Sequence, residues 1–98
     1  MDYEIELRPQ SFIDLEESFE WYSLQKENLG EEFLEHVEVC LNKIKENPYS
    51  YPITYKKLRK AFMKKFPFSI MYQITKNKIL VFSIFHSSRN PKTIGDRF

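Results

Sequence analysis

The sequence has little of what secreted and membrane proteins contain. Cysteine occurs once in 98 residues, as Cys40, so no disulfide can form within the chain. No apolar run approaches the roughly 18 residues of a membrane-spanning helix, and the charged N-terminus does not resemble a signal peptide. These absences favour a cytoplasmic protein without a membrane segment. Cys40 falls among apolar helix positions and is expected to be a buried spectator rather than a nucleophile.

The patterns of common catalytic and cofactor sites are also missing. The chain has no phosphate-binding glycine loop, no Cys/His spacing typical of a metal site and no Ser/His/Asp pattern. His36 follows Glu32 and Glu35 on an expected helix, where a solvated helix face explains it better than a metal site. We therefore expect no cofactor and no bound metal.

The composition is that of a folded domain. Hydrophobic residues make up 42% of the chain and aromatic residues 16%, which argues against disorder and supplies one modest core. Neither an internal repeat nor a low-complexity segment is present. At this length we expect a single domain over residues 1–98.

Charge is divided unevenly between the two halves of the chain. Residues 1–47 contain 13 Asp and Glu against 4 Lys and Arg, a balance of −9. Residues 48–98 contain 1 acidic residue, Asp96, against 11 Lys and Arg, a balance of +10. This asymmetry indicates an acidic layer and a basic layer, and the basic layer is a candidate surface for an anionic partner. The alternative is that the two layers neutralise each other across their contact.

The basic stretch from Leu58 to Pro91 predicts three consecutive strands. Ile79–His86 is apolar at nearly every position and is expected to lie inside the sheet. Before it, Phe68–Thr75 alternates apolar and polar residues, as a half-buried strand does. A third strand is predicted at Leu58–Met63. The turn between the last two strands is expected to place Asn77 in the left-handed conformation.

The acidic half predicts one strand and two helices. Asp2–Arg8 alternates apolar and charged residues, as a half-exposed strand does, and Pro9 ends it. Ser11 and Asp14 have the spacing of a helix N-terminal cap, and this helix is expected to run to about Lys26.

The second helix is predicted at about Glu31–Glu46, after a break at Asn28-Leu29-Gly30 in which Gly30 supplies a permissive backbone. A loop rich in tyrosine and proline follows at Tyr49–Lys57. The result is an α+β fold of two layers with the order β-α-α-β-β-β. A helix hairpin lies on one face of a four-stranded, mainly antiparallel sheet of order 1-4-3-2. Candidate residues for the other face are Arg59, Lys65, Ser69, Met71 and Gln73.

Several short motifs in the basic half match one known family. They are Leu58-Arg59, the run Lys65-Phe66-Pro67-Phe68-Ser69-Ile70 followed by Tyr72, and the close His86-Ser87-Ser88-Arg89-Asn90-Pro91. The chain resembles the RelE/ParE superfamily of type II toxin–antitoxin toxins over nearly its whole length. The ParE-like branch commonly shows a basic-Phe-Pro-aromatic turn, an Ile-x-Tyr strand and a His-x-x-Arg-x-Pro close. The resemblance implies the β-α-α-β-β-β fold expected above.

The resemblance implies one of two activities. ParE-like members resemble inhibitors of DNA gyrase, and RelE-like members resemble ribosome-dependent mRNA endonucleases that use strand Lys and Arg, an Arg near the last strand and a tail Tyr. Arg89 matches that arginine, but Asn90–Phe98 contains no tyrosine and Ser69 stands where the middle strand would offer an arginine. We therefore favour a ParE-like inhibitor over a RelE-like nuclease. A degenerate toxin kept as a binding module is a third possibility.

Candidate site residues follow from the same comparison. For catalysis they are Arg89, His86 and Arg59, and for target binding Lys60, Lys64, Lys65 and Arg97. The pKa of His86 suits acid–base work, although a histidine at the end of a buried strand is more often structural. Arg89 fits a phosphate, an antitoxin carboxylate or a structural brace.

The expected partners follow from the resemblance and from charge. They are a cognate antitoxin with an acidic, partly disordered segment, and either DNA gyrase or the ribosome with its mRNA as the target. The chain is expected to form a homodimer or a toxin–antitoxin hetero-oligomer.

Overall fold

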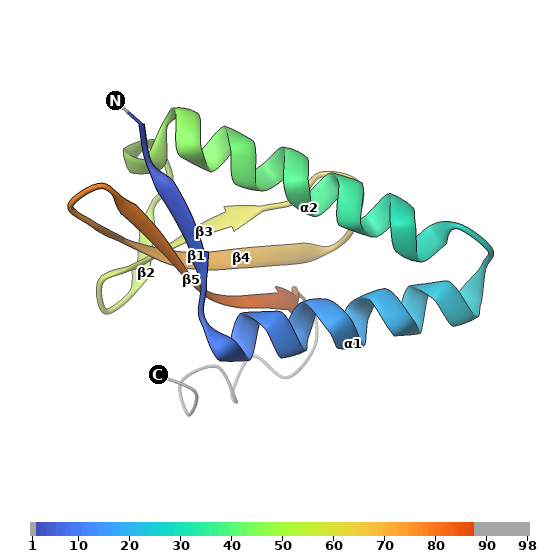
Figure 1. Ribbon diagram of the computed structural model, residues 1–98. Helices are drawn as coiled ribbons and strands as arrows, with labels where there is room; N and C mark the ends of the chain where they lie inside the picture. The colour runs from blue at the N-terminus through green and yellow to red at the C-terminus, as the bar shows by residue number, and fades with distance from the viewer. Residues whose placement is uncertain (1, 88–98) are drawn as a thin grey trace.

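Two helices pack against one face of a five-stranded mixed sheet in a computed structural model that describes residues 2–87 (Figure 1). The strand order is β1-β5-β4-β3-β2, in which β1 runs parallel to β5 and every other pair is antiparallel. The turns β2–β3 and β4–β5 lie at one end of the molecule, and the connection between the helices lies at the other. In chain order the elements are β1 (Glu4–Leu7), α1 (Pro9–Gln25), α2 (Leu29–Glu46), the 3-10 turn η1 (Pro48–Ser50), β2 (Ile53–Tyr55), β3 (Leu58–Phe62), β4 (Phe68–Thr75) and β5 (Lys78–His86).

The predicted order of the four main strands is confirmed, but the predicted number of strands is wrong. The last strand lies inside the sheet, between β1 and β4, as its apolar sequence indicated. The additional strand is β2, a three-residue edge strand within the loop that follows the helices. It pairs with β3 through an irregular register, in which Ile53 faces Arg59 and Tyr55 faces Leu58. Three residues are too few to show an alternating pattern, so the sequence did not reveal this strand.

The start of α1 differs from the prediction that Ser11 and Asp14 cap it. The helix begins at Pro9 with Arg8 as the N-cap, which suits proline because a first-turn residue has no helical partner for an N–H. The Ser11 hydroxyl instead donates to the Arg8 carbonyl oxygen at 2.7 Å. Asp14 turns toward β5, where its carboxylate accepts hydrogen bonds from the sheet.

The predicted break between the helices is confirmed at Asn28, but Gly30 is not the residue that supplies the permissive backbone. Asn28 takes the left-handed conformation, with φ 67°, and Gly30 lies buried in the first turn of α2. A Cβ at Gly30 would lie 2.9 Å from the Phe19 carbonyl oxygen of α1, so this glycine permits the close approach of the helices.

The turn between β4 and β5 places Lys76, rather than Asn77, in the left-handed conformation, with φ 49°. The Asn77 carbonyl oxygen accepts a hydrogen bond from the Glu4 N–H at 2.9 Å, which ties this turn to the start of β1.

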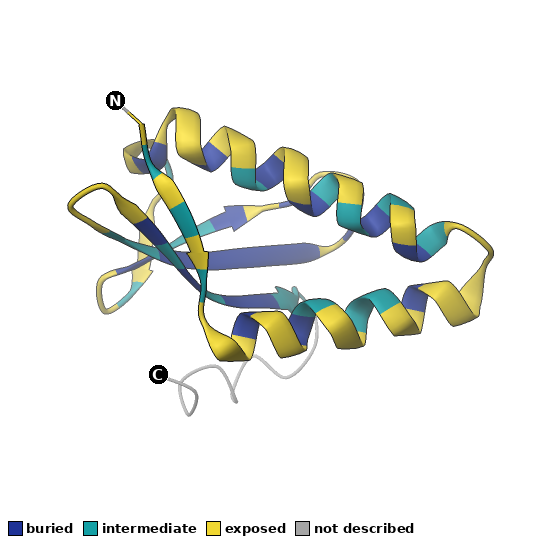
Figure 2. Cartoon of the chain, in the orientation of Figure 1, coloured by how far each residue is buried: buried dark blue, intermediate teal, exposed yellow. Residues whose placement is uncertain are grey.

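The helices bury one stripe each and leave the rest in solvent (Figure 2). The buried residues of α2 include Phe33, Val37, Cys40 and Ile44, at helical spacing. Cys40 is buried as predicted, and burial raises the pKa of its thiol. No helix within residues 2–87 is long and apolar enough to cross a membrane.

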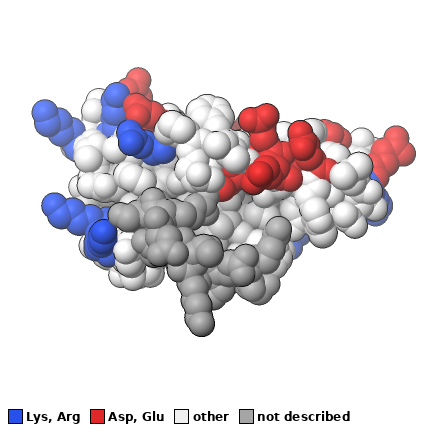
Figure 3. Space-filling model, turned by 90° about the horizontal axis from the view of Figure 1, so that it is seen from below, with Lys and Arg blue, Asp and Glu red and all other residues white. Residues whose placement is uncertain are grey.

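Charge is segregated in space as well as in sequence (Figure 3). Most Lys and Arg side chains in this view gather at the end that holds the β2–β3 and β4–β5 turns, whereas acidic side chains gather toward the end that holds the connection between the helices. Among residues 2–87, two exposed ion pairs join the two halves of the chain, Lys65 with Glu32 and Lys78 with Glu6. Such exposed pairs contribute little to stability.

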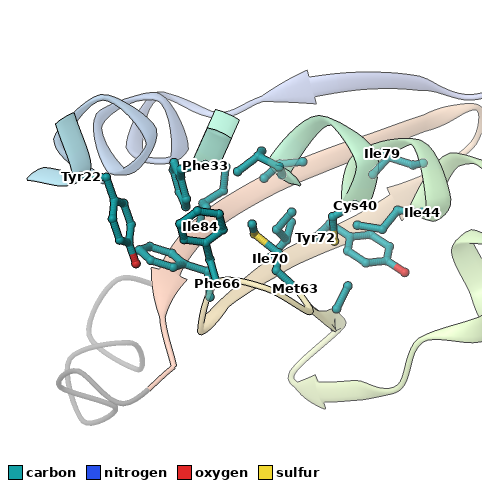
Figure 4. Close-up of a cluster of buried hydrophobic side chains, with 14 residues drawn as sticks. Tyr22, Phe33, Cys40, Ile44, Met63, Phe66, Ile70, Tyr72, Ile79 and Ile84 are labelled. Carbon is teal, nitrogen blue, oxygen red and sulfur yellow. The ribbon is translucent and has the colours of Figure 1, made fainter. Parts of the chain in front are cut away.

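The core fills the space between the helices and the sheet (Figure 4). Phe33 of α2 lies centrally, with its ring 5.2 Å from that of Tyr22 and 4.8 Å from that of Phe68. At the other end of the core, Tyr72 is fully buried and its hydroxyl donates to the Pro48 carbonyl oxygen at 2.6 Å. Burial raises the pKa of Tyr72, because the phenolate would lose its hydration there.

Candidate functional site

The candidate site is the side of the sheet that is turned away from the core, called here the outer face. Its side chains form rows across β3, β4 and β5, because directly paired residues of antiparallel strands project to the same side. One row contains Lys60, Met71 and Ser83, and the next contains Phe62, Ser69 and Phe85. Ser69, Met71 and Gln73 lie on this face as predicted, but Ser69 and Met71 are buried there rather than open to solvent.

Lys60 and two phenylalanines form a cationic and aromatic cluster on the outer face. The Lys60 ammonium lies 4.8 Å from the centre of the Phe62 ring and 5.7 Å from that of Phe85. Phe62 is 64% exposed and presents a large apolar area to solvent. An exposed aromatic beside a cation is the composition of a protein-binding surface.

A β-bulge shapes the other end of the outer face. Met71 pairs with Ser83 and Tyr72 pairs with Val81, which leaves Phe82 as an extra residue in β5. Bulges redirect side chains. The Arg8 guanidinium lies 5.6 Å from the centre of the Phe82 ring and so covers it at the start of α1.

A cavity of about 560 Å³ lies beside this bulge. It extends from the β2–β3 turn to the junction of β1 and α1, across the outer face of β4. Its walls combine cations, amides and apolar groups: Arg8, Lys56 and Lys57; Gln10 and Gln73; Pro9, Leu58 and Phe82.

Arg59 does not lie on the outer face, contrary to the expectation. It pairs with Tyr72 and therefore projects to the side of the helices. Its guanidinium donates to the carbonyl oxygens of Tyr51 at 2.6 Å and Tyr49 at 3.2 Å, and lies 5.1 Å from the centre of the Tyr49 ring. These contacts hold the loop between α2 and β2 against the sheet. The sequence could not show them, because register decides the side on which a strand residue projects.

The expectation that Lys65 lies on the outer face is also wrong. It lies in the turn between β3 and β4 and forms an ion pair with Glu32 of α2, which holds the pKa of that carboxyl below its usual value. Lys64, beside it in the same turn, is exposed. His36, one helical turn after Glu32, donates from Nδ1 to the Glu32 carbonyl oxygen at 2.9 Å and packs its ring on Phe66.

The structure does not bring the described catalytic candidates together. His86 ends β5 on the side of the helices, with its ring 5.3 Å from that of Phe68. Arg59 and His86 pair with Tyr72 and Phe68, which are four residues apart on β4 and so roughly 13 Å apart along the strand. Acid–base partners in catalysis act at hydrogen-bond distance. Arg89 and Arg97 lie outside the described residues.

Residues 5–91 match the family described as the ParE toxin of type II toxin–antitoxin systems, parDE. The chain belongs to the ParE toxin family. This confirms the resemblance inferred from the sequence motifs. A solved structure titled "Chromosomal ParDE TA system from P. aeruginosa" contains a chain with 16% sequence identity and a TM-score of 0.63. The similarity covers 86% of the present chain and 95% of that chain, and at this identity it shows the fold alone. None of the curated proteins matches the chain.

The sequence reasoning missed the residues that line this cavity of the ParE toxin. Arg8 is far in sequence from the neighbours Lys56 and Lys57, and the sheet order places all three around one cavity. The sequence held one signal for Arg8: it directly precedes Pro9 where the expected strand ends, so the junction of strand and helix sets its position. The bulge at Phe82 had no such signal, because β5 is apolar on both sides of it.

Proposed function

We propose that this ParE toxin inhibits DNA gyrase by binding it and that a cognate antitoxin, encoded beside it, holds it inactive. The observation that carries the proposal is the match to the ParE family over residues 5–91. The P. aeruginosa chain of similar fold comes from a ParDE system, in agreement with a toxin that works as one half of a pair.

The outer face supports inhibition by binding rather than by bond cleavage. Phe62 and Lys60 offer an aromatic anchor and a cation to a protein surface. RNA cleavage would instead require an acid, a base and cations around one phosphate. Among residues 2–87, Arg59 and Lys60 are not arranged around one phosphate in this way. Arg59 donates to loop carbonyl oxygens and projects from the opposite side of β3 to Lys60.

A supercoiling assay with purified gyrase tests the proposal directly. The wild-type toxin should inhibit supercoiling, and addition of the protein encoded by the adjacent gene should restore it. Inhibited translation with ribosome-dependent mRNA cleavage, and unimpaired supercoiling, would identify a RelE-like nuclease instead. No effect in either assay would indicate a degenerate binding module.

A matched pair of variants tests the role of the outer face. Phe62→Ala should weaken inhibition at least about tenfold, because truncation of an interface anchor costs about 2 kcal/mol or more. Phe12→Ala is the control, since Phe12 is 53% exposed but lies on α1. Both variants should unfold at nearly the wild-type temperature. Equal inhibition by the two variants would show that gyrase binds elsewhere.

A further inference from the structure

The cavity beside the bulge has the charge of an anion-binding site. Among residues 2–87, three cationic residues line it, Arg8, Lys56 and Lys57, and no acidic residue does. Leu58 and Phe82 add an apolar surface, of which Leu58 is only 5% exposed. Ligand sites typically combine an apolar surface with a few fixed polar groups, and this cavity has the volume of such sites. Its occupant should therefore carry both an anionic and an apolar group.

Part of the cavity wall is held in place before any partner arrives, whereas Lys56 and Lys57 are exposed. The Arg8 N–H donates to the Val81 carbonyl oxygen at 2.9 Å, which fixes the junction of β1 and α1 against β5. Arg8 also covers the ring of Phe82, and Leu58 belongs to β3. A partner that binds here need not order Leu58 or Phe82, so less binding free energy is lost to conformational entropy.

The distribution of charge favours a protein segment over a nucleic acid. A nucleic acid carries a negative charge at every phosphate and binds through an extended cationic surface. In the view of Figure 3 most cations lie at the end that holds the β2–β3 and β4–β5 turns, acidic side chains lie toward the other end, and the whole chain carries only +1. One or two carboxylates beside an apolar side chain match a cationic surface of this limited extent.

We propose that this cavity is an anchor site for the antitoxin and receives an acidic side chain together with a neighbouring apolar side chain of one extended segment. The inference rests on the proposed function, since it requires a cognate antitoxin. It adds the place where that antitoxin is held and the chemistry that holds it. The carboxylate lies against Arg8 and Lys57, and the apolar side chain lies against Leu58 and Phe82.

The test measures the dissociation constant of the complex between the full toxin and the protein encoded by the adjacent gene. Lys57→Gln and Arg8→Gln should each raise the Kd about tenfold or more and reduce its dependence on salt, because each removes a desolvated charge pair. Lys45→Gln, a matched change at an exposed lysine of α2, should leave the Kd within about twofold. Gln73→Trp, which fills the cavity and changes no charge, should also raise the Kd at least about tenfold.

The outcomes separate the anchor site from the proposed function. If the wild-type toxin binds no adjacent-gene product, the proposed function fails, and the inference fails with it. If the wild-type complex forms but Lys57→Gln and Gln73→Trp bind as tightly as the wild type, the anchor site alone is wrong. The anchor site is equally wrong if these variants lose only gyrase inhibition, since the cavity would then serve the target. A thermal unfolding curve for each variant shows that the protein measured is folded.

Discussion

Removing the carboxylate of Asp14 should destabilise this fold more than most single substitutions. β1 ends at Leu7, so among residues 2–87 no strand pairs with the second half of β5 on the side opposite β4, and α1 lies there instead. The Asp14 Oδ2 atom accepts from the Ile84 N–H at 3.0 Å and from the Ser83 hydroxyl at 3.1 Å, both buried. Gln10 donates to Oδ1 at 3.1 Å. At this edge of β5, Asp14 therefore accepts a backbone hydrogen bond that the carbonyl oxygen of a neighbouring strand would otherwise accept.

The magnitude follows from those contacts. A hydrogen bond to a charged group contributes about 1.5–3 kcal/mol, and a buried donor left without a partner loses its hydration as well. With two buried donors on one oxygen, Asp14→Ala should lower the free energy of unfolding by roughly 3–5 kcal/mol. For a chain of this length that is a decrease in Tm of about 12 °C or more. Asp14→Asn keeps an acceptor oxygen and should lose about half as much.

Urea unfolding followed by circular dichroism measures the loss, and the slope m should stay unchanged. Glu17→Ala is the control, because Glu17 is an exposed acid on the same helix and should change stability by less than about 0.5 kcal/mol. Amide exchange adds a local readout, since the Ile84 N–H should exchange much faster in Asp14→Ala. A loss below about 1 kcal/mol in Asp14→Ala would refute the reasoning, because hydration of both donors would then replace the carboxylate at little cost.

Three further predictions concern the core and the helix hairpin. Gly30→Ala should destabilise the fold by roughly 1–3 kcal/mol in urea unfolding, because the new Cβ would lie 2.9 Å from the Phe19 carbonyl oxygen. The higher helix propensity of alanine alone would stabilise the variant. A stabilised variant would therefore contradict the close approach of the helices. Tyr72→Phe should lose about 1–2 kcal/mol with the hydrogen bond to Pro48. The pKa of Tyr72 is raised in the folded state. The stabilisation of the fold by this tyrosine is therefore complete below pH 10.0, the usual pKa of the side chain, and is lost as the pH rises above it. Between pH 10 and 12 the wild type should lose more stability than Tyr72→Phe. Cys40 should react with a thiol reagent only after unfolding, and fast labelling of the folded chain would show that the thiol is accessible.

The fold could be predicted from the sequence where apolar residues form a long pattern, either a continuous run or a regular spacing over many positions. The apolar run of β5 indicated its internal position, and the helical stripe of α2 indicated its buried side. The alternation in β4 predicted a half-buried strand, which is wrong, because Ser69 and Met71 on its outer side are buried as well. The prediction failed where one short contact decides the outcome. A three-residue strand, the left-handed residue at Asn28 and the turn of Asp14 toward β5 each depend on a neighbour that the sequence does not place.

The site was harder to predict than the fold for the same reason. The sequence supplied the sign of the charge and the stretch that carries it, but it could not supply the register. Arg59 and Lys60 are adjacent and equally basic, yet one holds a loop on the helix side and the other lies beside Phe62 on the outer face. The residues around the cavity come from both halves of the chain, so a count of charge by halves could not bring Arg8 and Lys57 together.

The geometry of the outer face suggests how one antitoxin segment could block the toxin without changing its shape. Leu58 at the cavity and Phe62 in the aromatic cluster are separated by four residues of β3, roughly 13 Å along the strand. An extended peptide covers that distance in about four residues. A segment anchored in the cavity would therefore lie across Lys60 and Phe62, the surface proposed to bind gyrase. Neutralisation would then be direct competition, and the two functions would separate by mutation. Lys57→Gln should still inhibit gyrase but should need more antitoxin to be silenced, whereas Phe62→Ala should lose inhibition itself.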